Sequence, residues 1–182
     1  LNETKNTQQM LSNLLLWSKT QMEGVTVNLL PVNLKESILP AIRAQQSLAV
    51  EKKIKIEENI NKSIMVLADR DMLQLVIRNL VNNAVKFTEP GGQIGIDAKI
   101  QDGICLITIS DTGKGIPFEM QKDLFSLAIK STFGTQNEKG VGLGLSLCKE
   151  FTELQNGTIR FESEPGKGTR FFISFKLASA LS

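Results

Sequence analysis

The sequence of 182 residues contains no histidine, no cluster of lysine and arginine, and no apolar run near the roughly 18 residues that a membrane helix requires. Its net charge is only +2, which says little about partners. These absences argue against a nucleic-acid footprint and against a membrane span, so we expect a soluble module that contacts neither.

Cysteine is also scarce. Cys105 and Cys148 fall among apolar residues, one in an expected strand and the other in an expected helix. We interpret both as reduced core residues of a cytosolic protein, and a disulfide between them is the alternative. The chain begins at Leu1 without a start methionine or a signal sequence, so we expect it to be cut from a longer protein.

The composition is that of an ordinary globular protein, with 41% hydrophobic and 22% charged residues. The length fits one domain with an appendage, or two small domains. Residues 1–24 include a helix with a broad apolar face, which is too short to be stable without a partner helix. Residues 25–32 are expected to form a linker that holds Pro31, and residues 33–178 the main domain.

The main domain is expected to begin with a helix. Asn33 followed by Glu36 fits the N-terminal cap of a helix that ends near Lys53. Pro40 lies inside this helix, so the sequence predicts a kink or a break there.

Strands and helices then follow without regular alternation. Asp71 and Gln74 fit the cap of an amphipathic helix that ends before Pro90, and Asp102-Gly103 is a preferred tight-turn pair inside a hairpin. The second strand of that hairpin is more continuously apolar and should be the more central one. The remaining expected elements are strands at 54–60 and 64–68, helices at 117–124 and 142–155, and a hairpin of strands 158–163 and 169–176. We expect an α+β fold, a two-layer sandwich whose mixed, mostly antiparallel sheet has helices on one face.

The stretch N-L-V-N-N-A-V-K-F-T at 79–88 carries three polar residues on one stripe of its helix. Asn79, Asn83 and Lys86 are spaced four and three apart, which stacks them beside the apolar stripe. Amide oxygens suit Mg²⁺ and an ammonium suits phosphate, so the stripe could hold a metal-bound nucleotide. The alternative is that these residues simply border the buried face of a surface helix.

Two glycine-rich stretches follow. In D-T-G-K-G-I-P at 111–117, an aspartate can accept from an exocyclic amine, and glycines let the backbone pass close to a flat ring. An Asp-initiated turn is the alternative. In G-V-G-L-G-L at 140–145, glycines ahead of a helix expose N–H groups that suit a polyphosphate, although tight helix packing would explain them equally well.

Read in order, these stretches resemble the ATP-binding catalytic domain of sensor histidine kinases, members of the GHKL superfamily with the Bergerat fold. The stretch at 79–88 resembles the family's N box, D-T-G-K-G-I-P its first glycine box, and Asp123-Leu124-Phe125 its F box. G-V-G-L-G-L resembles the second glycine box, and G-K-G-T-R-F-F-I at 166–173 the terminal motif.

The resemblance implies ATP and Mg²⁺ as cofactors and assigns roles to matching positions. Asn83 matches the Mg²⁺ ligand, Asn79 its companion, and Lys86 the residue that touches the phosphates, and both Asn79 and Lys86 are expected to be catalytic. Asp111 matches the residue that reads adenine, and Thr169 the hydroxyl that supports it. The other nucleotide-binding positions implied are Phe87, Gly113, Gly115, Ile116, Gly140, Val141, Gly142, Leu143, Gly144 and Leu145.

Two further segments are assigned through the resemblance. Residues 128–139 would be the ATP lid, and Lys130 falls where many members carry a lid arginine aimed at the γ-phosphate. Lysine keeps the charge but loses the fork, so its catalytic role is a hypothesis beside that of a solvated lid charge. Residues 1–24 resemble the second helix of the dimerisation hairpin, whose first helix bears the acceptor histidine in the family.

The resemblance therefore implies a protein-histidine kinase. Its expected partners are the phosphoacceptor hairpin, of the same or a partner chain, a response-regulator receiver domain, and a second copy in a homodimer. We expect a cytoplasmic location, which includes the cytoplasmic part of a membrane-anchored sensor. Gyrase-type relatives carry Glu where this chain has Asn79, so we expect slow net hydrolysis here. A regulatory module that only binds nucleotide, a GHKL-type ATPase and a pure interaction fragment are the alternatives.

Overall fold

The computed structural model describes residues 26–126 and 144–178. A five-stranded sheet has the order β2-β4-β5-β7-β6, in which β2 and β4 are parallel and all other neighbours are antiparallel. A separate two-stranded sheet pairs β1 with β3. The strands are β1 (Leu30–Asn33), β2 (Lys55–Asn59), β3 (Met65–Ala68), β4 (Gln93–Gln101), β5 (Ile104–Asp111), β6 (Thr158–Glu164) and β7 (Gly168–Lys176).

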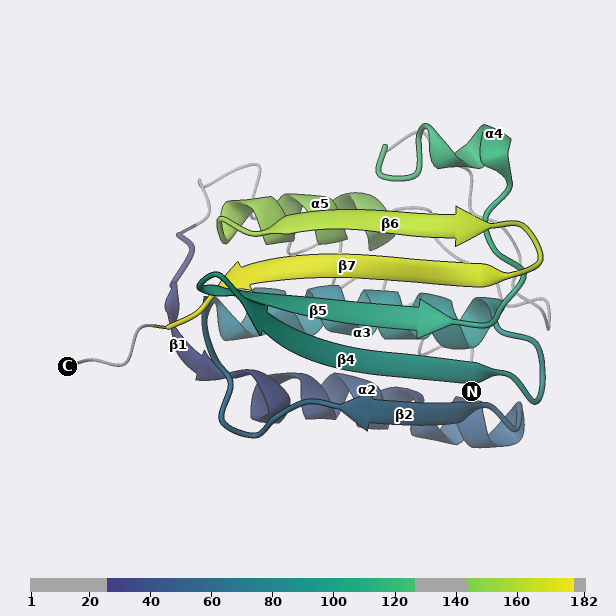
Figure 1. Cartoon of the computed structure of the whole chain (residues 1–182), viewed down its shortest axis with the longest axis horizontal. Helices are drawn as coiled ribbons and strands as arrows, with labels where there is room; N and C mark the ends of the chain where they lie inside the picture. Colours follow the sequence, from purple (N-terminus) through teal and green to yellow (C-terminus); the bar gives the residue numbers. More distant parts are fainter. Residues whose placement is uncertain (1–25, 127–143, 179–182) are drawn as a thin grey trace.

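The helices are α2 (Leu34–Glu51), α3 (Arg70–Phe87), the short α4 (Phe118–Gln121) and α5 (Gly144–Leu154). Figure 1 shows α2, α3 and α5 side by side behind the large sheet, with α4 at its β6 edge. The buried apolar side chains of α3 and of strands β4, β5 and β7 form one core between the layers. The expected α+β fold with a mixed, mostly antiparallel sheet is confirmed, and β5 is the central strand as predicted.

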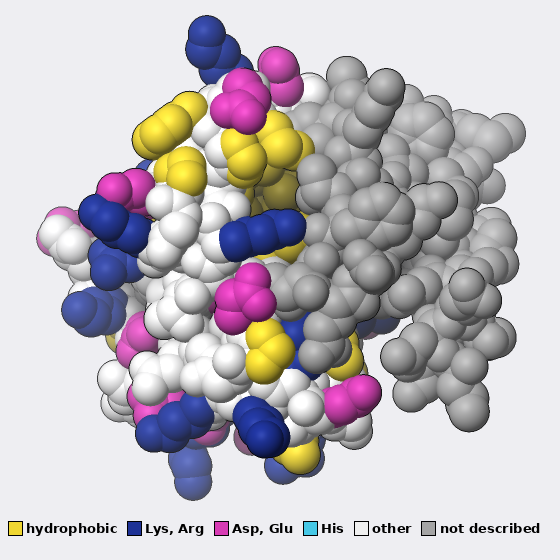
Figure 2. Space-filling model, turned by 90° about the vertical axis from the view of Figure 1, so that its right-hand side faces the viewer, with side chains coloured by type: hydrophobic (Ala, Val, Ile, Leu, Met, Phe, Trp, Pro, Cys, Tyr) yellow, Lys and Arg dark blue, Asp and Glu magenta, His cyan; other side chains and the backbone are white. Residues whose placement is uncertain are grey.

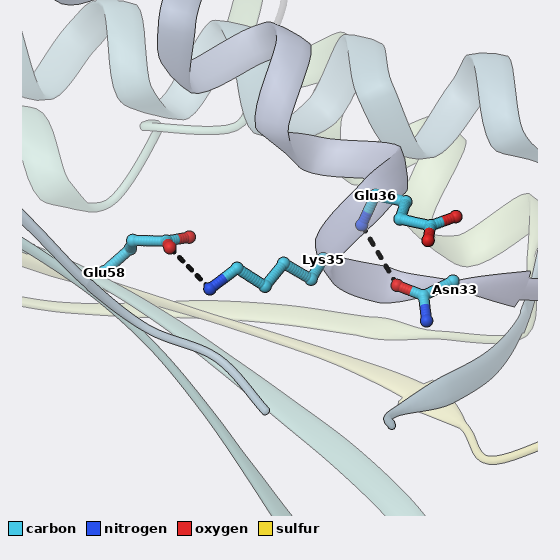
Figure 3. Close-up of polar contacts among 4 residues, drawn as sticks. All are labelled: Asn33, Lys35, Glu36 and Glu58. Atoms are coloured by element: carbon cyan, nitrogen blue, oxygen red, sulfur yellow. Dashed lines mark hydrogen bonds and ion pairs between the residues drawn. The ribbon is translucent and has the colours of Figure 1, made fainter. Parts of the chain in front are cut away.

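Helix α2 begins at the predicted cap. The side-chain Oδ1 of Asn33 accepts from the backbone N–H of Glu36 at 3.0 Å, and Lys35 pairs with Glu58 of β2 at 2.6 Å (Figure 3). Of the predicted kink or break at Pro40, the break is wrong, because α2 runs without interruption through this residue, and the kink stays a prediction. Pro40 and Glu36, whose carbonyl loses its helical donor, are both exposed, so water can satisfy that carbonyl.

Helix α3 begins two residues earlier than predicted. Its cap is Asp69, not Asp71, because Asp69 Oδ1 accepts from the N–H groups of Asp71 and Met72 at 3.1 and 3.2 Å. The second oxygen of Asp69 accepts from the N–H of Asn28 at 3.1 Å, which ties the preceding segment to the start of this helix.

Part of the expected linker is structured, since residues 30–33 form β1 and pair with β3. The predicted turn at Asp102-Gly103 joins β4 and β5, and both residues have positive φ, at 50° and 76°. Cys105 and Cys148 are buried free thiols, as predicted. The expected helix within residues 1–24 and the expected lid at 128–139 lie outside the described residues, and the domain boundaries stay predictions.

Candidate nucleotide-binding site

The last three turns of α3 carry the polar stripe. Asn79 and Lys86 are buried, with exposed fractions of 5% and 6%, and Asn83 between them is half-buried. The Lys86 ammonium lies 4.7 Å from the centroid of the Phe87 ring, and that of Lys114 lies 5.1 Å from the same centroid. Two cations therefore gather at the C-terminal end of α3, where an anionic group would be stabilised.

Asn79 of α3 lies close to the start of α5. Its Oδ1 lies near Gly144, 3.6 Å from the position that a Cβ would take there. Its amide nitrogen is buried and has no nitrogen or oxygen acceptor among the described residues, and only the weak acceptor Cys148 Sγ is beside it. Burial raises the pKa of the neighbouring Cys148 thiol, which donates to the Val76 carbonyl at 3.7 Å. A buried amide donor with only a weak sulfur acceptor is poorly satisfied, so its side chain is suited to a polar ligand.

Asp111 closes β5 opposite Thr169 of β7. Its Oδ1 accepts from the N–H groups of Gly113 at 2.8 Å and Thr169 at 3.3 Å. Burial raises the pKa of Asp111 to about 6, and these two hydrogen bonds oppose that rise. The structure thus holds a half-buried carboxylate whose orientation is fixed by two backbone donors.

The segment after Asp111 is packed too closely for side chains at its glycines. A Cβ on Gly113 would overlap the carbonyl oxygen of Phe87, at the end of α3. Gly115 has φ +66°, and a Cβ there would overlap the carbonyl oxygen of Glu164 in the β6–β7 turn. Lys114, between the glycines, donates its N–H to Phe87 O at 3.2 Å. These contacts join the end of α3, the first glycine-rich stretch and the second hairpin.

A residue that the sequence analysis missed, Ser163, connects several of the expected positions. Its Oγ accepts from the N–H of Ile116 at 2.8 Å and lies 2.9 Å from Thr169 Oγ1. Gln121 of α4 donates to the carbonyls of Ile116 and Ser163 at 2.8 and 3.2 Å. A single serine in a strand has no local signal, because its partners lie up to 47 residues away.

Most of these groups lie at one end of the molecule. In Figure 1, the end of α3, the end of β5 and the beginning of β7 share the right-hand side, whereas α5 begins nearer the middle, where Gly144 lies close to Asn79. Figure 2 faces that side and shows basic, acidic and hydrophobic side chains intermixed there. Leu145 is half-buried against the core. Of the expected site residues, Lys130, Gly140, Val141, Gly142 and Leu143 lie outside the described part of the chain.

Two negative findings concern the described ranges 26–126 and 144–178. None of their helices is long and apolar enough to cross a membrane. Within these ranges, no three residues among His, Cys, Asp and Glu gather as metal ligands would.

Comparison with protein families decides the assignment. The family model described as histidine kinase-, DNA gyrase B-, and HSP90-like ATPase matches residues 68–179. The chain belongs to this ATPase family. The match begins at the end of β3 and takes in α3, β4 to β7 and every position expected to bind nucleotide, so these residues form an ATP-binding domain of the histidine kinase-like ATPase family.

Similar proteins are named as sensor proteins or sensory kinases. The alginate biosynthesis sensor protein KinB of Pseudomonas aeruginosa is 40% identical over 105 residues, which are 58% of this chain and 17% of KinB. The adaptive-response sensory kinase SasA of Crocosphaera subtropica is 30% identical over 95% of this chain and 47% of its own length. The chain of this family member thus spans less than half of the length of these curated relatives.

Solved structures agree with the family assignment. The catalytic domain of the histidine kinase ThkA superposes with a TM-score of 0.71 at 28% identity, over 82% of this chain and 95% of that domain. The full-length ShkA in complex with AMPPNP gives a TM-score of 0.78 at 24% identity, over 98% of this chain and 38% of ShkA, which shows the fold alone. The predicted resemblance to the ATP-binding domain of histidine kinases is confirmed.

Proposed function

We propose that this ATPase-family domain is the phosphoryl donor of a protein-histidine kinase, which transfers the γ-phosphoryl group of ATP to a histidine on a helical hairpin. The observation that supports it best is the contact between Phe87 and the Gly113-Lys114 backbone. This contact brings the cations at the end of α3 to the same end of the domain as the Asp111 carboxylate. A nucleotide needs both, since cations can stabilise its phosphates and a carboxylate can accept a hydrogen bond from its purine base.

Asp111 would recognise adenine. One of its oxygens is held by the N–H groups of Gly113 and Thr169, and its carboxylate would accept from the exocyclic amine of adenine. Guanine presents a carbonyl oxygen at that ring position, which a carboxylate repels. Thr169, bonded to Ser163, would support the same orientation, with Gly115 and Ile116 beside it.

The residues on α3 fit a metal-bound triphosphate. Asn83 offers an amide oxygen, a hard ligand of the kind Mg²⁺ prefers, and the buried Asn79 amide nitrogen has only the weak acceptor Cys148 Sγ beside it among the described residues. When bound, Mg²⁺ would neutralise part of the phosphate charge. Lys86 would contact the phosphates, supported by Phe87. The expected phosphate positions Gly140, Gly142 and Gly144, and the hypothesis for Lys130, belong to the same proposal.

The transfer needs little covalent help from this chain. The imidazole nitrogen of the acceptor forms a bond to the γ-phosphorus while the bond to the β-phosphate oxygen breaks, so that ADP leaves and the imidazole loses a proton to solvent. The chain contains no histidine, so the acceptor must be on another segment. Lys86 and backbone N–H groups would stabilise the charge on the transferred oxygens.

Asn79 favours transfer over hydrolysis. An amide at this position has no proton-accepting capacity comparable to that of a carboxylate, so water near the phosphate is not activated. The phosphoryl group would then be retained for the incoming imidazole. We extend the proposal to the partners: the longer protein would act as a homodimer in the cytoplasm and pass the phosphoryl group to a response regulator. A structure of ThkA in complex with the response regulator protein TrrA has the same fold at 23% identity.

The decisive experiment is phosphotransfer. The chain is mixed with γ-labelled ATP, Mg²⁺ and a separately supplied hairpin that carries the acceptor histidine. We expect an acid-labile label on the hairpin, and none with Asn83→Ala. A chain that binds ATP but leaves the hairpin unlabelled would be a regulatory nucleotide-binding module, and a chain that binds no nucleotide would leave only an interaction role.

A further inference from the structure

The C-terminal end of α3 is fully satisfied by hydrogen bonds. The last four carbonyls of a helix have no partner within it, and here they belong to residues 84–87. Thr88 donates to Ala84 O through both its N–H, at 3.0 Å, and its hydroxyl, at 2.6 Å. Lys114 N–H donates to the carbonyl of Phe87. The two carbonyls between them, of Val85 and Lys86, both accept from the side chain of Lys52.

Lys52 comes from the end of α2, 33 and 34 residues before its acceptors. Its ammonium donates to Val85 O at 2.9 Å and to Lys86 O at 3.1 Å. The side chain is 1% exposed and is among the largest fully buried side chains of the described residues. Burying an ammonium costs free energy unless it is well hydrogen-bonded. The two bonds to the end of α3 therefore fix the position of the Lys52 ammonium.

The backbone of Lys52 is fixed as well. Its N–H donates to Leu48 O at 3.0 Å as the C-terminal cap of α2, and its carbonyl accepts from Gly91 N–H at 3.0 Å. Gly91 belongs to the turn that follows α3. Lys52 therefore connects the end of α2, the end of α3 and the turn after it, and it has little freedom to move independently of them.

The positive charge of Lys52 matters because it lies at the C-terminal end of α3. A helix C-terminus has a partial negative charge, which repels an anion. Lys86 and Phe87 occupy this end, and under the proposed function the phosphates approach it. An ammonium within hydrogen-bond distance of the last carbonyls compensates that negative end and fixes the backbone of Lys86.

We propose that Lys52 is a positioning residue for the phosphates of the nucleotide: it acts through the backbone of Lys86 and through the compensated helix end, and it does not touch the ligand. This inference rests on the proposed function. It predicts an effect on ligands that carry phosphates and no effect on the part of the ligand read by Asp111. A merely structural role for Lys52 would weaken both alike.

The test compares Lys52→Gln, which keeps donors but removes the charge, with Lys52→Arg, which keeps both. Lys55→Gln is the matched control, because Lys55 is an exposed lysine of the same region that pairs with Glu57. Binding of Mg-ATP and of adenosine to the 182-residue chain is measured by calorimetry and NMR titration. We expect Lys52→Gln to weaken Mg-ATP about tenfold, as for a charge at a partly buried helix end, with adenosine changed less than about twofold. Lys52→Arg should retain Mg-ATP affinity within about threefold, and Lys55→Gln should match the unsubstituted chain.

Equal loss of ATP and adenosine affinity in Lys52→Gln, or no loss of either, would overturn the role of Lys52. If that variant does not fold, the carbonyl ¹³C resonances of Val85 and Lys86 in the unsubstituted chain decide. They should shift with Mg-ATP and not with adenosine, and unchanged resonances would also overturn the proposal. Failure of the unsubstituted chain to bind Mg-ATP is a different result, since it removes the proposed function itself.

Discussion

Two opposing effects act on Asp111: burial disfavours its charge, while the proposed recognition of adenine uses the charged form. Its pKa is raised to about 6 from 3.8. We predict that adenosine affinity falls as the pH is lowered through 6, to about one tenth at pH 5, because the protonated carboxyl no longer offers a full acceptor to the amine. Titration by NMR between pH 5 and pH 8 measures this.

The same group should act on stability with the opposite sign. Its folded pKa lies above the unfolded value, so the protonated form is favoured by folding. Relative to Asp111→Asn, the free energy of unfolding of the nucleotide-free protein should therefore increase as the pH falls from about 6 towards 4. Asp111→Asn should also bind adenosine with no step near pH 6. A pH step that survives in this variant would assign the titration to another group.

The backbone at Gly113 lies very close to the carbonyl oxygen of Phe87. A Cβ there would overlap Phe87 O, so we predict that Gly113→Ala lowers the free energy of unfolding by about 2 kcal/mol and weakens ATP binding, because the end of α3 must move. Gly166→Ala is the control: a Cβ there meets nothing within 4 Å, and its φ of +80° costs about 1 kcal/mol. Urea denaturation and ATP titration of both variants test this. ATP affinity reduced equally in the two would contradict the role of close approach.

At the scale of elements, most helices and strands could be predicted because their signals are local. The cap Asn33, the turn Asp102-Gly103 and the apolar stripe of α3 each show within a few residues. The start of α3 was misplaced because Asp69 and Asp71 are equally good caps in sequence, and only the direction of their side chains separates them. The sequence predicts a linker where β1 forms, since this strand is short, contains Pro31 and pairs with a single partner strand.

Lys52 could not be found from sequence. It lies in E-K-K between a helix and a strand, where a lysine is expected to be solvated, and its acceptors are more than thirty residues away. Tertiary packing alone places it under α3. The motifs of the site, in contrast, can be identified from sequence because glycines and aspartates at turns give a local signal. The resemblance is needed to assign their roles.

Helix α2 carries a prediction of its own. Pro40 removes one hydrogen bond inside an otherwise regular helix of 18 residues. We predict that Pro40→Ala raises the free energy of unfolding by about 1 to 3 kcal/mol, because the Glu36 carbonyl regains a donor and Ala is the better helix former. Gln46→Ala, at another exposed position of α2, should change it by less than about 0.5 kcal/mol. Thermal and urea unfolding measure both, and a destabilised Pro40→Ala would show that Pro40 has a packing role instead.

At the scale of the whole molecule, the site depends on contacts between segments far apart in the chain. The register of β5 with β7 places Thr169 against Asp111, 58 residues earlier, and α5 brings Gly144 to Asn79. The order of motifs along the chain indicates the family but not these distances. The sheet and its helical layer convert separate stretches into one end of the domain that can hold a nucleotide.

The isolated chain is expected to hydrolyse ATP more slowly than it transfers the phosphoryl group. The 182 residues include no histidine to accept a phosphoryl group, and under the proposed function the amide at position 79 supplies no base for water. We predict that phosphate release from Mg-ATP is at least about a hundredfold slower than transfer to an added acceptor hairpin, since general-base assistance contributes about 10² to 10⁴ in rate. Asn83→Ala is the control, and release that persists in it marks a contaminating ATPase. If release depends on Asn83 and matches the rate of transfer, water is attacked efficiently without a base at position 79, and the domain is an ATPase.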